Sequence, residues 1–244
     1  MGKIINSVAS IVRLFFFALI AIFVIRIFTS NIANEQIKEG MRYLAFVISS
    51  LFCAKVFDKL SLEDLGLHYS YRIILYFVLG LCLVVVLYSI SQYSLGNKST
   101  YIAIQSLNKD YAMLLYWFLV ALGEEVLFRG YLLAKIKKNY STVTAIIVSG
   151  IIFSLLHFVN SEISGASSYV LLFSFGFLIS WICINLRSVW FGIGVYLAWN
   201  YIDTFIENTS LEKTMIFGIA IILFIIAILS TNHDKQYQDT SQVS

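Results

Sequence analysis

Long apolar segments separated by short polar connectors dominate the chain. A helix needs about 20 residues to cross the roughly 30 Å hydrocarbon core of a bilayer, and about eight segments approach that length. They are centred on residues 8–28, 41–57, 71–95, 110–130, 142–159, 167–186, 188–206 and 214–230. None of them alternates like a strand, and helices satisfy their own backbone hydrogen bonds inside lipid. The pattern therefore predicts an all-α, polytopic membrane protein with about eight transmembrane helices.

Composition agrees with a membrane protein, because 59% of the residues are hydrophobic and 13% are charged, against roughly 25% charged in soluble domains. The partners expected from this are the lipid bilayer and no nucleic acid. The N-terminal apolar run lacks a small-residue cleavage site, so we interpret it as an uncleaved first span. If the N-terminus is cytoplasmic, the inner connectors hold most of the lysines and arginines, and both termini are then predicted to be cytoplasmic.

Three regions follow from this pattern. Residues 1–110 would form the first three transmembrane helices and their connectors, residues 111–230 a transmembrane core, and residues 231–244 a polar cytoplasmic tail. We expect the basic residues Lys135 to Lys138 to anchor the topology, and residues 58–69 to form a polar cytoplasmic connector. The cysteines Cys53, Cys82 and Cys183 lie in apolar segments with no metal-binding spacing, which predicts small buried side chains.

Two adjacent carboxylates interrupt the fourth apolar segment, in Glu124-Glu125-Val-Leu-Phe-Arg129. An ionised group in hydrocarbon costs several kcal/mol unless it is paired or faces a polar cavity, so it indicates a functional site. On a helix Glu125 and Arg129 are four residues apart and can pair, whereas Glu124 points about 100° away and stays free for chemistry. Counting back from Lys135 places Glu124 roughly 16 Å inside the membrane.

Two further apolar segments carry polar side chains at the same helical spacing. Phe153 and His157 share one face near the end of the fifth segment, and Tyr196 and Asn200 share one face in the seventh. Taken singly, a buried histidine is more often a packed core residue and a mid-span asparagine more often a link between helices. Together with Glu124, they predict hydrolysis of a peptide bond: a Glu–His pair activates water, and Asn or Tyr donors stabilise the oxyanion.

These motifs resemble those of the CPBP (Abi) family of intramembrane endopeptidases, which includes CAAX prenyl endopeptidases and bacteriocin-processing or bacteriocin-immunity proteins. The resemblance covers about residues 115–203 and rests on the order of three motifs. The first is Glu-Glu-x-x-x-Arg at Glu124, Glu125 and Arg129, the second Phe-x-x-x-His at Phe153 and His157, and the third His-x-x-x-Asn, represented by Tyr196 and Asn200.

The resemblance implies that Glu124 and His157 activate the hydrolytic water, that Arg129 positions the glutamate helix, and that the third motif contacts the oxyanion. It also implies a peptide or protein substrate and a bacterial cell membrane. Both metal-dependent and glutamate mechanisms are described for the family. This chain departs from the family pattern at Tyr196, where the family usually has histidine.

Tyr196 bears differently on the two mechanisms. Zinc sites need about three protein ligands, and a tyrosine phenol is a poor replacement for imidazole, whereas it can serve as an oxyanion donor. The sequence therefore favours a glutamate mechanism without a cofactor, with zinc on Glu124 and His157 as the metal alternative. Two other classes stay open, a catalytically inactive bacteriocin-immunity or regulatory protein of the same fold, and a proton-coupled transporter that uses Glu124 and His157 as a relay.

Overall fold

The apolar segments form helices throughout the part of the chain that the computed structural model describes, which is residues 2–94, 110–157 and 166–205. Seven of the predicted apolar segments correspond to helices there, and the described residues contain no strand, so the all-α prediction is confirmed. The predicted segment at 214–230 and the predicted tail at 231–244 lie outside the described residues.

The described helices follow one another in this order: α1 Gly2–Phe28, α2 Glu35–Cys53, η1 Ala54–Asp58, α3 Arg72–Ser94, α5 Tyr111–Glu125, η2 Val126–Leu132, α6 Leu133–Asn139, α7 Thr142–Leu156, α8 Ala166–Leu186 and α9 Trp190–Phe205. Within the described residues, four continuous stretches are long and apolar enough to cross a membrane: Ile4–Phe28, Glu35–Asp58, Arg72–Ile90 and Tyr111–Asn139. Two shorter apolar helices accompany them, Thr142–Leu156 and Leu172–Leu186.

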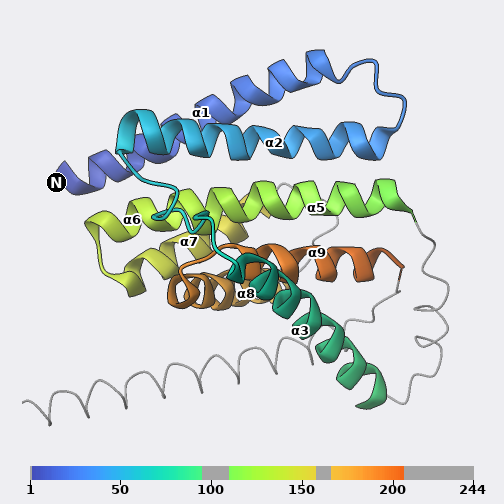
Figure 1. The fold of residues 1–244 in the computed structure, drawn as a ribbon. Coiled ribbons are helices and arrows are strands. Elements are labelled where there is room, and N and C mark those ends of the chain that lie inside the picture. Colours follow the sequence, from blue (N-terminus) through green and yellow to red (C-terminus); the bar gives the residue numbers. More distant parts are fainter. Residues whose placement is uncertain (1, 95–109, 158–165, 206–244) are drawn as a thin grey trace, which may run out of the picture.

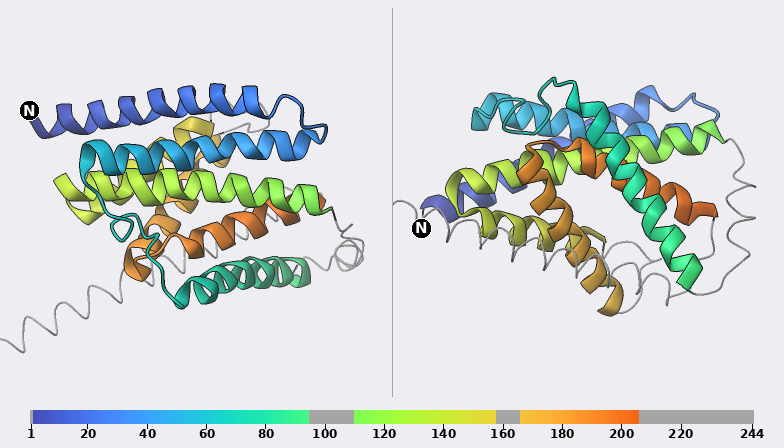
Figure 2. Two further views of the ribbon diagram at one scale, coloured as in Figure 1. Left: turned by 45° about the horizontal axis from the view of Figure 1, so that its top comes forward. Right: turned by 60° about the horizontal axis from the view of Figure 1, so that its bottom comes forward.

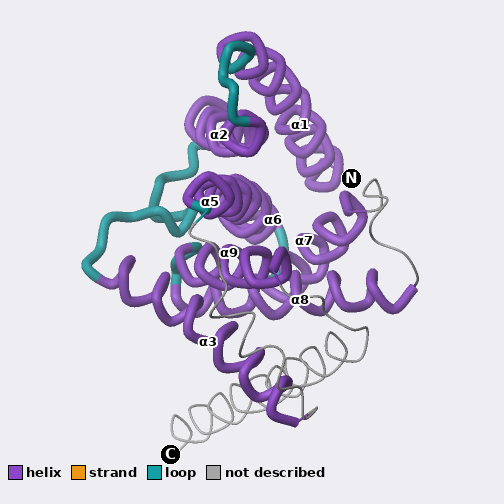
Figure 3. Tube along the Cα trace, turned by 90° about the vertical axis from the view of Figure 1, so that its right-hand side faces the viewer, coloured by secondary structure: helices purple, strands orange, loops and turns teal. Residues whose placement is uncertain are grey.

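The helix that carries the paired carboxylates lies in the middle of the molecule. α5 packs against α2 on one side and against α9 on the other, while α1 lies outside α2 and α3 crosses outside α9 (Figure 1). The two rotated views in Figure 2 show the same succession, with α7 and α8 packed together beside the α6 end of the central helix. The last two turns of α5, which carry the paired carboxylates, are therefore buried between neighbouring helices, and Figure 3 shows α5 lying between α2 and α9.

Glycines allow α5 and α9 to approach their neighbours closely. A side chain at Gly123 would lie 2.6 Å from the backbone oxygen of Tyr43 in α2, and a side chain at Gly194 would overlap the backbone oxygen of Phe77 in α3. Close approach through small residues is the usual way in which helices pack within a membrane. Two helices of the predicted core, α5 and α9, are thus in direct contact with helices from residues 1–110.

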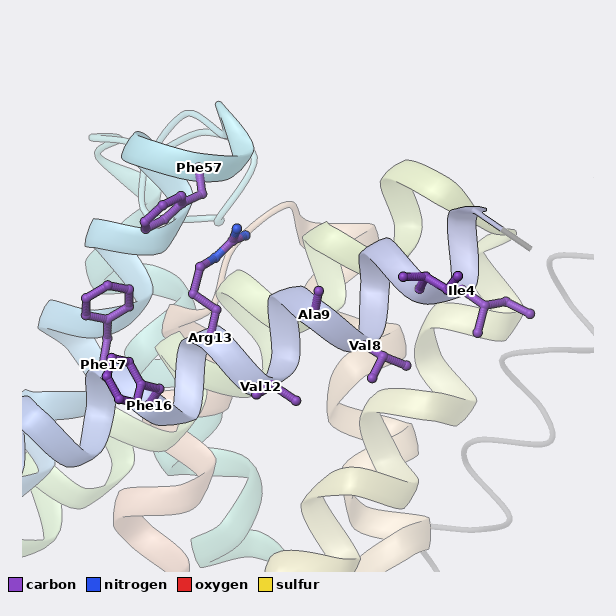
Figure 4. Close-up of a pocket in the computed structure, with 9 residues that line it drawn as sticks. Ile4, Val8, Ala9, Val12, Arg13, Phe16, Phe17 and Phe57 are labelled. Carbon is purple, nitrogen blue, oxygen red and sulfur yellow. The ribbon is translucent and has the colours of Figure 1, made fainter.

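The outer face of α1 is apolar and uncovered. Val8 and Val12 are 54% and 64% exposed, and with Phe57 of η1 they border a shallow groove of about 740 Å³ (Figure 4). Arg13 also borders this groove, and its guanidinium lies 4.2 Å from the centre of the Phe57 ring. A surface of this kind is stable in contact with lipid, so α1 agrees with a membrane-spanning first helix.

The fourth segment was predicted at 110–130, but the helix continues without a break to Asn139. Its middle part, η2, has wide π-helical turns, in which backbone hydrogen bonds reach five residues back and one extra residue is accommodated. The basic stretch at 135–138 belongs to this continuous helix, and Lys135 is only 5% exposed, so it is more than a solvated topology anchor. Its charge is neutralised by Asp58, which is also buried.

The connector between η1 and α3 is folded onto the helices. Its Ser61 donates hydrogen bonds from its backbone N–H (2.8 Å) and hydroxyl (2.9 Å) to Asp64, and the backbone N–H bond is the main reason that the pKa of Asp64 lies below its usual range. Leu65 is buried, and Gly66, with a φ of 68°, accepts a hydrogen bond from the backbone of Val189. The predicted polar connector is therefore only partly exposed.

One cysteine prediction is wrong. Cys53 and Cys183 are buried, as expected, but Cys82 is exposed, because it lies on the outer side of α3. In a membrane such a position faces lipid, where a small apolar side chain is equally stable.

Candidate active site

Glu124 and His157 face each other from two helices. Glu124 lies in the last turn of α5, and His157 follows directly on the last residue of α7. The distance from His157 Nε2 to Glu124 Oε2 is 4.0 Å, and the two side chains keep exposed fractions of 17% and 12%. The pair is thus enclosed but still reachable by a small molecule such as water.

The hydrogen bond on the other nitrogen of His157 defines its tautomer. Nδ1 lies 2.8 Å from the backbone oxygen of Phe153, and since a carbonyl only accepts, Nδ1 carries a proton and donates it. A neutral His157 then presents the lone pair of Nε2 towards Glu124. Oε2 of Glu124 is buried and has no hydrogen-bond partner among the described residues, so two proton acceptors face the same small space.

Tyr196 joins this pair from α9. It is 8% exposed, and its hydroxyl is within hydrogen-bonding reach of the Glu124 carboxylate, to which it can donate. A third helix therefore contributes a polar group to the same point, as the sequence analysis predicted.

Asn200 is placed differently from the expectation. Its side-chain nitrogen donates a 2.8 Å hydrogen bond to the backbone oxygen of Tyr196, one turn earlier in α9. The backbone oxygen of Asn200 accepts from Thr204, whose hydroxyl in turn accepts from Trp117 of α5. Asn200 is half-buried near the site, but among the described contacts its side chain has no bond to Glu124 or His157.

Glu125 and Arg129 form the ion pair that their spacing predicted. Arg129 Nη1 lies 2.6 Å from Glu125 Oε1, and both side chains are completely buried. The carboxylate packs against α9 at Gly192, where a side chain of any size would overlap it. Gly192 thus allows a charged side chain to approach α9, whereas Gly194, two residues later, allows the backbone of α3 to approach.

Phe153 is the packing centre that links the ion pair to the site. It is fully buried, and the Arg129 guanidinium carbon lies 4.3 Å above the centre of its ring. The ring also lies 4.6 Å from that of His157 and 6.4 Å from that of Tyr196. This arrangement stacks the cation against an aromatic face and fixes the histidine and tyrosine relative to α5.

Two residues of the segment 1–110 contact the continuous helix that carries Glu124, and the sequence did not predict either contact. Tyr43 of α2 packs against Gly123, the residue before Glu124, and its phenol is close enough to Glu124 and Tyr196 to interact with both electrostatically. Asp58 of η1 binds the segment that follows Glu125. The only signal for Asp58 in the sequence was its position directly after an apolar run, where a charge needs a partner.

The three motifs lie in a segment of the chain that matches a known protein family. Residues 107–202 match the Rce1-like family of type II CAAX prenyl endopeptidases. The matched segment contains α5 to α8 and most of α9, so it includes every candidate site residue. No curated protein matches the chain. The match confirms the family resemblance and, at the level of the family, supports a CAAX-type endopeptidase with a peptide substrate at the membrane.

The family match assigns no role to an individual residue, so the roles of the site residues stay predictions. For a metal ion, Glu124 and His157 offer two ligands from adjoining helices. No group of three His, Cys, Asp or Glu side chains with metal-binding geometry occurs among the residues that the structure describes. The Tyr196 phenol, which is within hydrogen-bonding reach of Glu124, is a weak zinc ligand, so the described residues do not fit a zinc site.

Proposed function

We propose that this protein is an intramembrane endopeptidase of the glutamate type that hydrolyses a peptide bond near the cytoplasmic membrane face. It would be a multi-pass protein of a bacterial cell membrane with both termini in the cytoplasm. The observation that supports the proposal most strongly is the Glu124–His157 pair, in which two proton acceptors face one enclosed point.

The proposed reaction begins with a water molecule between these acceptors. A water that donates one bond of about 2.8 Å to each acceptor separates them by roughly 4–4.5 Å, which agrees with the 4.0 Å between Nε2 and Oε2. His157 orients the water through Nε2. Glu124 takes a proton from the water while the water oxygen attacks the carbonyl carbon of the scissile bond. The proton then passes to the leaving amine as the C–N bond breaks.

Tyr196 would stabilise the negative charge that develops on the carbonyl oxygen. Its hydroxyl already points to the reacting group and is shielded from bulk water, where a hydrogen bond to an oxyanion has its largest effect. The second N–H of the Asn200 amide, which the bond to the Tyr196 backbone leaves free, would add a weaker contact from the same helix.

The proposed mechanism needs no cofactor and can be tested directly. Purified protein in detergent is incubated with a library of peptides and membrane-protein segments, with and without a chelator, and products are identified by mass spectrometry. Cleavage that persists under chelation supports the glutamate mechanism. Chelator-sensitive cleavage that zinc restores would contradict it and would require a third ligand beyond Glu124 and His157.

Tyr196→Phe is expected to lower kcat by roughly 10²-fold with little change in KM, because an oxyanion donor acts mainly in the transition state. Tyr196→His is the matched control, since it places an imidazole N–H, usual in the family, on the same helix face. It should retain much of the parental kcat. Equal kcat for the parent and the Phe variant would remove Tyr196 from the mechanism.

Tyr196 also favours a second candidate, an inactive family member that binds a bacteriocin or a regulatory partner instead of cutting it. In that case Glu124→Gln and His157→Gln variants would keep full protective activity in cells exposed to the bacteriocin. Loss of protection in both variants, with normal expression, would rule this candidate out.

A further inference from the structure

A second charged cluster lies away from the candidate active site, where α1, η1 and the central helix meet. Its centre is the carboxylate of Asp58, which is 7% exposed. Arg13 Nη2 donates to both carboxylate oxygens at 3.2 and 3.1 Å, and the Tyr131 hydroxyl and Lys135 Nζ each donate a further bond. Lys138 binds the backbone oxygen of Asp58 at 2.9 Å.

This cluster joins the N-terminal helices to the helix of the predicted active site. Arg13 belongs to α1, Asp58 ends η1, and Tyr131 and Lys135 lie in η2 and α6. Tyr131 is completely buried, and Asp58 is the partner of its hydroxyl. The bond between Tyr131 and Asp58 therefore connects the two π-helical segments, η1 and η2, to each other.

The position of η2 gives this bond consequences for the site. η2 starts directly after Glu125, contains Arg129 and ends one residue after Tyr131. A π-helical segment holds one residue more than the α-helical turns that it replaces. The helix after it is therefore rotated by about 100° relative to the helix before it. If η2 relaxed to regular α-helix, Glu124 would rotate away from His157 or α6 would rotate away from η1.

Each end of η2 has its own charged anchor. At the start, Arg129 binds Glu125, and at the end, Tyr131 and Lys135 bind Asp58. Wide turns have poorer backbone geometry than an α-helix, so they persist where side-chain contacts hold them. Such strained segments are frequent at functional sites.

We propose that Asp58 is a positioning residue that, through Tyr131, holds η2 in its wide-turn register and thereby keeps Glu124 opposite His157. The effect of Asp58 on catalysis rests on the proposed function, whereas its effect on the position of Glu124 does not. It assigns to residues 1–110 a part in building the active site, in addition to spanning the membrane.

The geometry is tested by cross-linking, without any substrate. Glu124→Cys and His157→Cys are combined in a Cys82→Ser background, so that the exposed native thiol does not react. A short bifunctional thiol reagent replaces direct disulfide formation, because Cys is shorter than Glu and His. The rate of bridging is compared by mass spectrometry in the parent, with Asp58→Asn, with Tyr131→Phe and with Lys138→Gln.

Bridging is expected to slow several-fold with Asp58→Asn and with Tyr131→Phe, and to stay at the parental rate with Lys138→Gln. The control Lys138→Gln removes a bond to the backbone of Asp58 while leaving its carboxylate partners in place. Should Asp58→Asn fail to fold, Tyr131→Phe, which removes a single oxygen, provides the test alone. Parental bridging rates in a folded Tyr131→Phe variant would overturn the proposal.

Measuring kcat and KM separately distinguishes a positioning role from a general loss of stability. With a cleavable peptide, Tyr131→Phe should lower kcat roughly 10- to 100-fold with KM unchanged, because misplacement of a catalytic group by about 1 Å has this effect. If the parent cleaves nothing, the proposed function fails while the cross-linking comparison still decides the positioning role. If the parent cleaves and the kcat of Tyr131→Phe is unchanged, the positioning role fails while the function stands.

Discussion

Replacing Glu124 with glutamine is expected to abolish peptide cleavage, with a loss in kcat of roughly 10²- to 10⁴-fold, the range that a general base contributes. Glutamine has nearly the same shape as glutamate and can still accept a hydrogen bond from Tyr196. It cannot take a proton from water, however, so only the chemical step is lost. The measurement is the rate of product formation from a peptide that the parent cleaves, at equal amounts of monodisperse protein.

The stability of this variant should move in the opposite direction. Glu124 has a buried carboxylate oxygen without a hydrogen-bond partner among the described residues, and such an atom costs free energy of folding. Removing the carboxylate is therefore expected to leave the melting temperature unchanged or to raise it. A loss of activity without a loss of stability is typical of a residue retained for function.

The control for this experiment is Glu35→Gln, which removes an exposed carboxylate paired with Lys38 at the start of α2. It should leave both cleavage and melting temperature unchanged. If Glu124→Gln cleaves at the parental rate, the proposed mechanism is wrong, and the buried carboxylate would need another role, such as binding.

The positions of the helices could be predicted from the sequence, because long apolar segments mark where helices can cross a membrane. The predicted segment at 71–95 became α3, and the motif spacing placed Glu125 next to Arg129 and His157 on the face of Phe153. These relations are local, within one or two helical turns, so sequence spacing is sufficient to derive them.

Contacts between distant segments could not be derived in this way. The bond from Tyr131 to Asp58 joins residues that are 73 positions apart. The wide turns of η2 have no recognisable pattern in the sequence. Asn200 shows the same limit, since its spacing from Tyr196 was correct but its side chain binds the backbone of its own helix. Helix rotation and register depend on packing partners, which a single sequence does not identify.

The buried pair of Glu125 and Arg129 gives the largest stability effect that we expect. Arg129→Met would remove the cation and leave the Glu125 carboxylate buried without a partner, at a cost of about 3–5 kcal/mol in the free energy of unfolding. The loss includes the stacking of the guanidinium on Phe153, at 4.3 Å. Reversible denaturation in mixed micelles, followed by a change in helix content, measures this free energy.

The companion variant Glu125→Gln, combined with Arg129→Met, should recover most of the loss, because neither charge then remains in the interior. The matched control is the pair of Arg42 and Glu39 in α2, which also lies within one helical turn, at i,i+3 instead of i,i+4, but has a carboxylate that is 44% exposed. Arg42→Met should cost no more than about 1 kcal/mol, since solvent can replace the lost partner. If Arg129→Met cost as little as Arg42→Met, the ion pair would not stabilise the helix that carries Glu124, and the stability of the site would have to come from helix packing alone.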